Sequence, residues 1–184
     1  MKNYFIAGVV VACMSFLLMS CGSDSSTSTS SSAGTFSNPT GIYTDGTYVY
    51  VADTGSNTIR YVGISTGTAA ILAGSTAGTA GFTNGNGTGA LFNAPSGITS
   101  DGTNLYIADK GNNVIRKIVI SSGVVTTFAG NTGGASGSTD GAGTAALFYA
   151  PSGITSDGTY LYVSDAGNNS IRKIVIATAV VTTL

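Results

Sequence analysis

The sequence predicts an all-β fold made of repeated four-stranded antiparallel sheets. Three observations support this: one phrase recurs three times, short β-branched runs alternate with glycine and asparagine turns, and charged residues are scarce. Of the 184 residues, 42% are hydrophobic and only 8% are charged, against about 25% charged in an average globular chain. This composition indicates a packed domain that holds few ion pairs.

The recurring phrase sets the length of the repeat. Prolines Pro39, Pro95 and Pro151 are spaced 56 residues apart, and each opens the same motif. In the second copy the motif reads PSGITSDG from residue 95, LYIAD from residue 105 and NNVIRKI from residue 112. The predicted units are residues 36–91, 92–147 and 148–184, and the last unit is incomplete.

Each unit is expected to form four strands. In the second copy these are residues 97–100, 105–109, 114–120 and 124–129, each bounded by Gly, Asp or Asn turn signals. Several runs are apolar at consecutive positions, so both faces of each sheet must be covered. Sheets stacked face to face around an axis meet this requirement, which predicts the blades of a β-propeller. A glycine-rich connector of 17 residues, at residues 75–91 and 131–147, then leads from the fourth strand of one unit to the first strand of the next.

The phrase Pro-x-Gly-Ile-x-x-Asp-Gly, followed by Tyr-Ile/Val-Ala-Asp and Asn-x-Ile-Arg-Lys-Ile, resembles the NHL repeat over residues 36–184. The resemblance implies a propeller, often six-bladed, that binds proteins, carbohydrates or nucleic acids, and in a minority of members a lyase or lactonase-like enzyme. Three blades do not complete a ring. The chain is therefore expected to be part of a longer ring, or one half of a six-bladed ring closed by self-association; an open half-ring is the third alternative.

The first 20 residues are expected to be a signal peptide. Lys2 precedes an uncharged stretch, residues 5–19, which is shorter than the roughly 20 residues needed to span a bilayer. The stretch ends in Leu18-Met19-Ser20-Cys21, which resembles the bacterial lipoprotein box and implies lipidation of Cys21. A plain secretory signal is the alternative.

Both readings place the folded part outside the cytoplasm. In the lipoprotein family an aspartate after the lipidated cysteine retains the protein at the inner membrane, so Gly22 favours the outer membrane. Residues 21–35 are rich in Ser and Thr and are expected to form a flexible tether between the lipid and the domain.

The composition disfavours most catalytic chemistry. The chain has no His, and all eight acidic residues are Asp, so a Ser-His-Asp triad, an imidazole base and a His-ligated zinc are excluded. Cys13 lies in the predicted signal peptide, and Cys21 would carry the lipid. The sequence thus predicts no catalytic residue, metal site or cofactor, and its net charge of −1 disfavours nucleic acid as a partner.

The charged residues follow the repeat. Every copy has an aspartate at the end of its second strand and an arginine seven residues later, which predicts an ion pair within or between blades, bidentate where geometry allows. The predicted structural pairs are Asp53 with Arg60, Asp109 with Arg116, and Asp165 with Arg172.

The connectors differ more between copies than the strands do. If the protein binds a ligand, the connectors are where variation could specify it, and the candidate rim-loop contacts are Phe82, Asn84, Asn86 and Asp140.

These features together predict a lipid-anchored binding or scaffold module of the cell envelope, non-catalytic in the part present, with a protein or a glycan as its partner. One alternative is a fragment of an extracytoplasmic propeller enzyme, lyase or lactonase-like, whose catalytic residues lie on further blades. A purely structural envelope repeat is the other.

Overall fold

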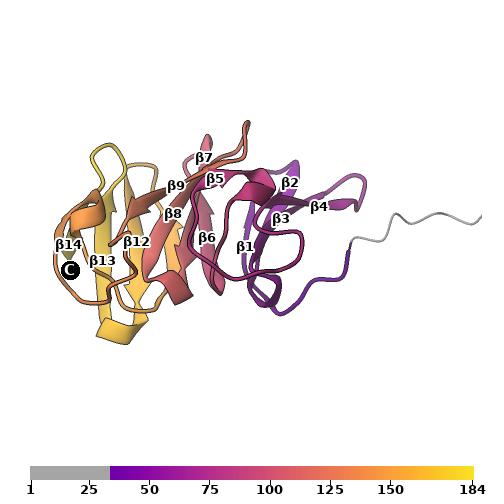
Figure 1. Ribbon diagram of the computed structural model, residues 1–184. Coiled ribbons are helices and arrows are strands. Elements are labelled where there is room, and N and C mark those ends of the chain that lie inside the picture. Colours follow the sequence, from indigo (N-terminus) through magenta and orange to yellow (C-terminus); the bar gives the residue numbers. More distant parts are fainter. Residues whose placement is uncertain (1–33) are drawn as a thin grey trace, which may run out of the picture.

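The computed structural model describes residues 34–184, which form three antiparallel sheets lying side by side in chain order (Figure 1). The predicted signal peptide, the lipidation site Cys21 and nearly all of the tether lie outside the described residues. Within residues 34–184 no helix is long and apolar enough to cross a membrane.

Each sheet contains one four-stranded meander, and we call the sheets blades 1, 2 and 3. The strands of blade 1 are β1 (Pro39–Thr44), β2 (Tyr48–Asp53), β3 (Thr58–Gly63) and β4 (Ala69–Ala73). Those of blade 2 are β6 (Pro95–Ser100), β7 (Asn104–Asp109), β8 (Val114–Val119) and β9 (Val124–Ala129). Those of blade 3 are β11 (Pro151–Ser156), β12 (Tyr160–Asp165), β13 (Ser170–Val175) and β14 (Val180–Thr183).

The predicted all-β propeller class is confirmed, and the ring is open after three blades. In blade 2 the predicted strand limits agree with the observed ones to within two residues. Each second strand leads into a short 3-10 turn before the third, namely η1 (Thr54–Ser56), η3 (Lys110–Asn112) and η5 (Ala166–Asn168).

The connectors add a strand that the sequence did not predict. Strand β5 (Gly85–Asn86) pairs with β9, and β10 (Gly141–Ala142) pairs with β14, so blades 2 and 3 each have five strands. The connector thus follows the outer edge of the next blade, where it satisfies backbone groups that an edge strand leaves unpaired. A two-residue strand of Gly-Asn or Gly-Ala has no β propensity to reveal it.

The 3-10 turns η2 (Gly87–Gly89) and η4 (Gly143–Ala145) follow these short strands and lead into the next blade.

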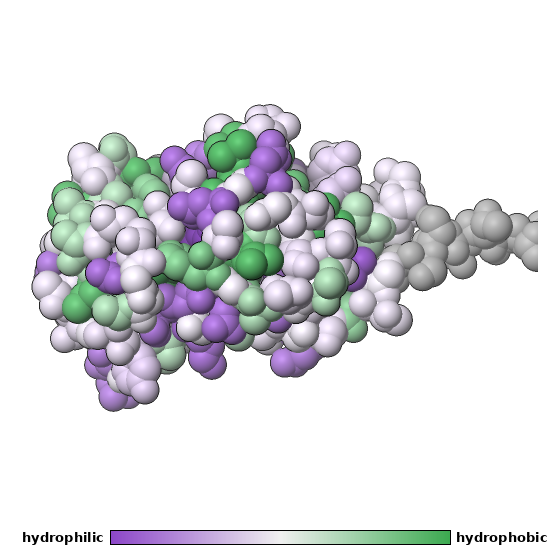
Figure 2. All heavy atoms as spheres, viewed as in Figure 1, coloured by the Kyte–Doolittle hydropathy of each residue, from purple (hydrophilic) through white to green (hydrophobic). Residues whose placement is uncertain are grey.

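The blades pack face to face, and the middle blade packs through both of its faces. Blade 1 buries one face against blade 2, and blade 2 buries its opposite face against blade 3, as the consecutive apolar positions predict. The first interface contains Tyr50, Ala52 and Ile59 facing Ile98, Leu105 and Ile107; the second contains Tyr106, Ala108 and Ile115 facing Leu161, Val163 and Ile174. On the outer surface seen in Figure 2, polar and apolar residues are mixed.

A glycine in each first strand allows neighbouring blades to approach closely. Strands β1, β6 and β11 are neighbours, and a Cβ atom on Gly97 would lie 2.5 Å from the carbonyl oxygen of Ser152. Hydroxyl groups then join the strands, since Thr40 Oγ1 donates to the Ser96 carbonyl at 3.1 Å and Ser96 Oγ donates to the Ser152 carbonyl at 2.9 Å. The spacing of the blades therefore depends on having glycine, which has no side chain, at positions such as Gly97.

We expect Gly97→Ala to destabilise the fold by about 1 to 3 kcal/mol, because the added methyl group must push two backbones apart. Urea unfolding followed by circular dichroism measures this. Gly89→Ala is the matched control: nothing lies within 4 Å of its Cβ position, and the third copy already has Ala145 there. Equal unfolding midpoints for the two variants would refute the close-approach argument.

Candidate functional site: the connector rim

The paired aspartates and arginines lie at one end of the blades, where the second strand ends and the third begins. Arg116 Nη1 is 3.0 Å from Asp109 Oδ2, and neither side chain is exposed. The equivalent distance is 2.9 Å between Arg172 and Asp165 and 3.7 Å between Arg60 and Asp53. Each pair lies within one blade.

The ion pairs are single contacts rather than bidentate ones. The second oxygen of each aspartate accepts a backbone N–H group from the residue at the end of the preceding connector. For Asp109 this donor is Asn93, at 2.8 Å, while the side chain of Asn112 donates to Asp109 Oδ2, also at 2.8 Å. The aspartate therefore holds the turn, the connector and the arginine together.

The arginines fasten the connectors to the blades. Arg116 Nη1 also donates to the Leu91 carbonyl at 3.0 Å, and its Nη2 donates to the Thr83 carbonyl and to Asn84 Oδ1, both at 2.9 Å. Arg172 repeats the pattern with Leu147 at 2.7 Å, Thr139 at 3.0 Å and Asp140 at 2.8 Å. We call each arginine with its aspartate and its connector partners an arginine clamp.

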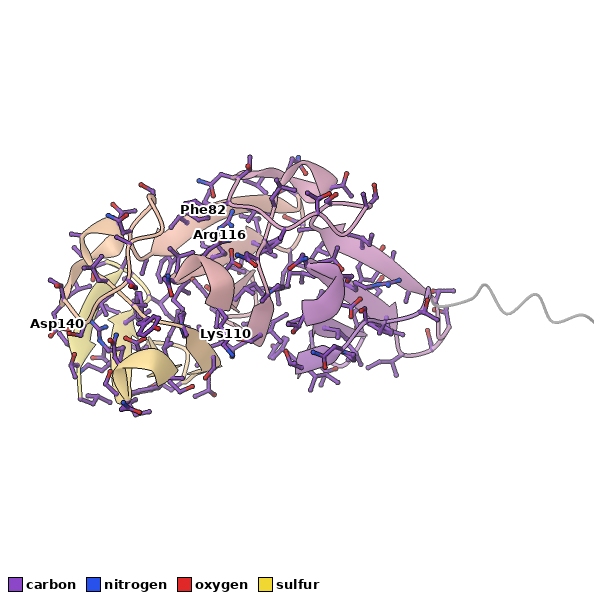
Figure 3. All side chains as sticks on the ribbon, turned by 60° about the horizontal axis from the view of Figure 1, so that its bottom comes forward. Phe82, Lys110, Arg116 and Asp140 are labelled. Carbon is purple, nitrogen blue, oxygen red and sulfur yellow. The ribbon has the colours of Figure 1, made fainter. Side chains whose placement is uncertain are left out.

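Aromatic rings complete the clamps. The Arg116 guanidinium carbon lies 5.1 Å from the ring centroids of both Phe82 and Phe92, a distance at which a cation is attracted by the ring. Figure 3 shows Phe82 beside Arg116, and it shows Asp140 apart from them on the next blade. In the third copy Ser138 replaces Phe82 and Asp140 replaces Asn84, so a second carboxylate takes over part of the neutralisation of Arg172.

Three of the four candidate ligand contacts are therefore engaged within the fold. Phe82 and Asn84 contact Arg116, and Asp140 contacts Arg172 and Thr183. Asn86 lies in β5 and is exposed. A ligand role for these residues stays a prediction. A ligand bound here would contact Phe82, Asn84 or Asp140 while that residue also contacts its clamp arginine.

Two exposed side chains at the same end were missed by the sequence analysis. Lys110 begins η3, and Tyr149, which is 50% exposed, precedes β11. Their equivalents differ in chemical class: Thr54 and Ala166 correspond to Lys110, and Ser37 and Asn93 correspond to Tyr149. A position-by-position comparison of the three turns could have found both.

We call this end of the blades the connector rim; it comprises the 3-10 turns η1, η3 and η5 and the connectors. Antiparallel pairing brings these segments together, because Pro95 pairs with Asp109 and Ile115 with Ala129. The hairpins at the opposite end repeat Asp-Gly-Thr from residues 45, 101 and 157. In all three the glycine has a positive φ, which matches the predicted tight turn.

The electrostatics of the rim are dominated by burial. Loss of solvent raises the pKa of Asp109 to about 6, although hydrogen bonds from Asn93 and Asn112 and the charge of Arg116 act in the opposite direction. Burial likewise lowers the pKa of Arg116. Within residues 34–184 no three His, Cys or Asp side chains gather as metal ligands would.

We expect Asp109→Ala to lower the free energy of unfolding by about 3 kcal/mol, because it leaves the buried Arg116 charge without a carboxylate. Asp165→Ala is the matched variant, and its cost should be smaller by at least about 1 kcal/mol, since Arg172 keeps Asp140 at 2.8 Å. Chemical denaturation at pH 7 compares the two. The clamp argument fails if Asp165→Ala is the more damaging change.

Stability should also depend on pH through Asp109. Between its ordinary pKa of 3.8 and about 6, the folded state holds a proton that the unfolded state releases, so this group stabilises the fold less as pH rises. Relative to Asp109→Asn, the wild-type protein should therefore lose stability from about pH 4 to about pH 6.

Urea midpoints for both proteins across this range provide the test. Hydrogen bonds hold the pKa of Asp45 and Asp157 below the ordinary value, but these carboxylates are present in both proteins and cancel in the difference. A difference that stays constant with pH would show that Asp109 does not titrate in this range.

Comparison with known proteins places this geometry in a family. No family model matches the chain. Human NHL repeat-containing protein 2 is 32% identical over 145 residues, which cover 74% of this chain and 20% of the human protein. An auxiliary nutrient binding protein from Bacteroides thetaiotaomicron is similar with a TM-score of 0.64 and 28% identity, over 78% of this chain and 36% of that one.

Virginiamycin B lyase from Staphylococcus aureus shares the fold, with a TM-score of 0.54 and 21% identity over 80% of this chain and 41% of the lyase. The chain thus spans only a fifth to about two-fifths of these proteins. The three 56-residue copies, their blade geometry and the similarity to the human NHL protein agree. The chain belongs to the NHL-repeat family of β-propeller proteins.

Proposed function

We propose that the chain is a non-catalytic binding module of the bacterial cell envelope, and that its ligand contacts the connector rim. One observation carries this proposal. Exposed side chains at the connector rim differ in chemical class between copies that are otherwise nearly the same, as Lys110 differs from Ala166 and Tyr149 from Asn93. Variation in chemical class at exposed loop positions of a repeated scaffold is typical of a recognition surface.

A glycan fits the chemistry of this rim best. Lys110 is its only lysine among the described residues, and the rest of the surface offers amides, hydroxyl groups and the half-exposed ring of Tyr149. Such groups donate to and accept from sugar hydroxyls, and an aromatic ring gives the apolar face of a sugar a surface on which to pack. The similarity to an auxiliary nutrient binding protein supports a binding role.

The proposed location follows from the sequence. A signal peptide over residues 1–20 and a lipid on Cys21 would anchor the chain to the extracytoplasmic side of a membrane, and Gly22 favours the outer membrane. The tether would then present the blades to ligands outside the cytoplasm.

The acidic residues support a non-catalytic role for the part present. Each aspartate in residues 34–184 accepts hydrogen bonds in a hairpin or a clamp. Asp109 and Asp165 are fully buried against arginines, so neither can reach a substrate as a general base.

Isothermal titration of the purified chain with short neutral hexose oligosaccharides tests the proposal. The double variant Lys110→Ala/Tyr149→Ala should bind at least about tenfold more weakly, because it removes both the hydrogen-bonding amine and the aromatic surface. Thr103→Ala, in an exposed hairpin at the opposite end of blade 2, is the matched control and should bind like the wild-type protein. Absence of saturable binding by the wild-type chain, or equal weakening by the control, would overturn the proposal.

A further inference from the structure

The first and last blades each leave one apolar face uncovered. We call the free surface of blade 1 the leading face; it surrounds a groove of about 420 Å³ lined by Phe36, Ile42, Val49, Val51 and Val62, among others. We call the free surface of blade 3 the trailing face; its groove of about 310 Å³ is lined by residues that include Thr155, Tyr162, Ser164 and Ile171.

Each free face repeats most of a surface that is buried elsewhere in the same chain, although Ser164 and Ser170 stand where blade 2 buries Ala108 and Val114. Ile42 on the leading face is 71% exposed, whereas Ile98, the same position in blade 2, is 6% exposed against blade 1. Ile171 on the trailing face is 47% exposed, whereas its equivalents Ile59 and Ile115 are fully buried. The leading and trailing faces are therefore the two halves of one interface, which the chain already forms twice.

A polar contact series ends at the same two faces. Asn57 Oδ1 accepts the backbone N–H of Ala94 at 2.8 Å, and Asn113 Oδ1 accepts that of Ala150 at 2.9 Å, each across a blade boundary. The next acceptor in this series is Asn169 and the first donor is the backbone N–H of Asn38. Within residues 34–184 neither Asn169 nor the Asn38 N–H group makes a hydrogen bond across a blade boundary. If a first blade packed on the trailing face, its Asn38 N–H group could donate to Asn169 Oδ1 in the same way.

The first strands show the same incomplete series. The backbone near Gly41 and Gly97 closely approaches the next first strand, at the Ser96 and Ser152 carbonyls. Gly153, the third member, is exposed, and nothing from another blade lies near its Cβ position among the described residues. A strand like β1, beginning with Pro39 and Thr40, would have the required shape.

We propose that two copies of the chain join head to tail, with the trailing face of each on the leading face of the other, and close a six-bladed ring. A contact between two different faces closes into a ring only when the rotation fits a whole number of subunits. Propellers have about four to eight blades. Two copies of the three described blades give six, which lies within this range, whereas one copy gives three and three copies give nine. This inference does not depend on the ligand proposed for the connector rim.

Sedimentation of the full purified chain, in mild detergent with bound detergent subtracted, should give twice the mass of one chain. Ile42→Asp and Ile171→Asp each place a charge in both interfaces of the ring, so each variant alone should sediment as a monomer. Both side chains are exposed in the single chain, and circular dichroism should show unchanged β structure. Ser121→Asp, in an exposed hairpin away from both faces, is the matched control and should remain a dimer.

Mixing the two monomeric variants distinguishes this geometry from any other dimer. An equimolar mixture has one intact interface, formed by the leading face of the Ile171→Asp chain and the trailing face of the Ile42→Asp chain, so dimers should reappear. Thr155→Arg, at an exposed position whose equivalent Thr99 is buried, can replace Ile171→Asp should that variant misfold. A monomeric wild-type chain, a mass that grows without limit at higher concentration, or no dimer in the mixture would overturn the proposal.

Discussion

Mutual covering of apolar sheet faces is the constraint on which this structure depends. Strands such as β7 are apolar on both sides, so a single blade would expose one hydrophobic surface to water on each face. Stacking solves this for blade 2, which is covered by blade 1 and by blade 3. The outer faces of blades 1 and 3 carry many of the same apolar residues without a neighbour, and for this reason Ile42 and Ile171 remain exposed.

The buried arginines solve a second problem, which is how to order a long connector that has few large apolar residues. A fully buried guanidinium is costly unless its charge is neutralised and its N–H groups are bonded. In blades 2 and 3 one neutralising aspartate, Asp109 or Asp165, comes from the same blade as the arginine. The other acceptors, including the Asp140 carboxylate at Arg172, come from the connector. The cost of burying the charge is thereby linked to the path of the connector, which must stay in place for the Nη groups of the arginine to keep their hydrogen bonds.

This division of roles separates scaffold from surface. The Asp and Arg residues of the clamps, the hairpin aspartates and the first-strand glycines are the same in every copy, since each meets the same geometric demand in every blade. Residues that meet no such demand are free to differ, and Lys110 and Tyr149 are exposed examples on the connector rim. A recognition surface on a repeat protein is expected at such positions, because substitutions there leave the blade spacing unchanged.

The sequence by itself determined the repeat, the four strands of each blade, the Asp-Gly hairpins and the need for neighbours on both faces, because these follow from local periodicity and turn chemistry. The seven-residue spacing between Asp109 and Arg116 also brings these two residues to the same end of adjacent strands. Only the tertiary structure decided that Arg116 reaches Leu91 and Thr83, which lie 25 and 33 residues earlier in the chain. The physical reason is that the connector follows the unpaired edge of β9, and such an edge exists only after the next blade has folded.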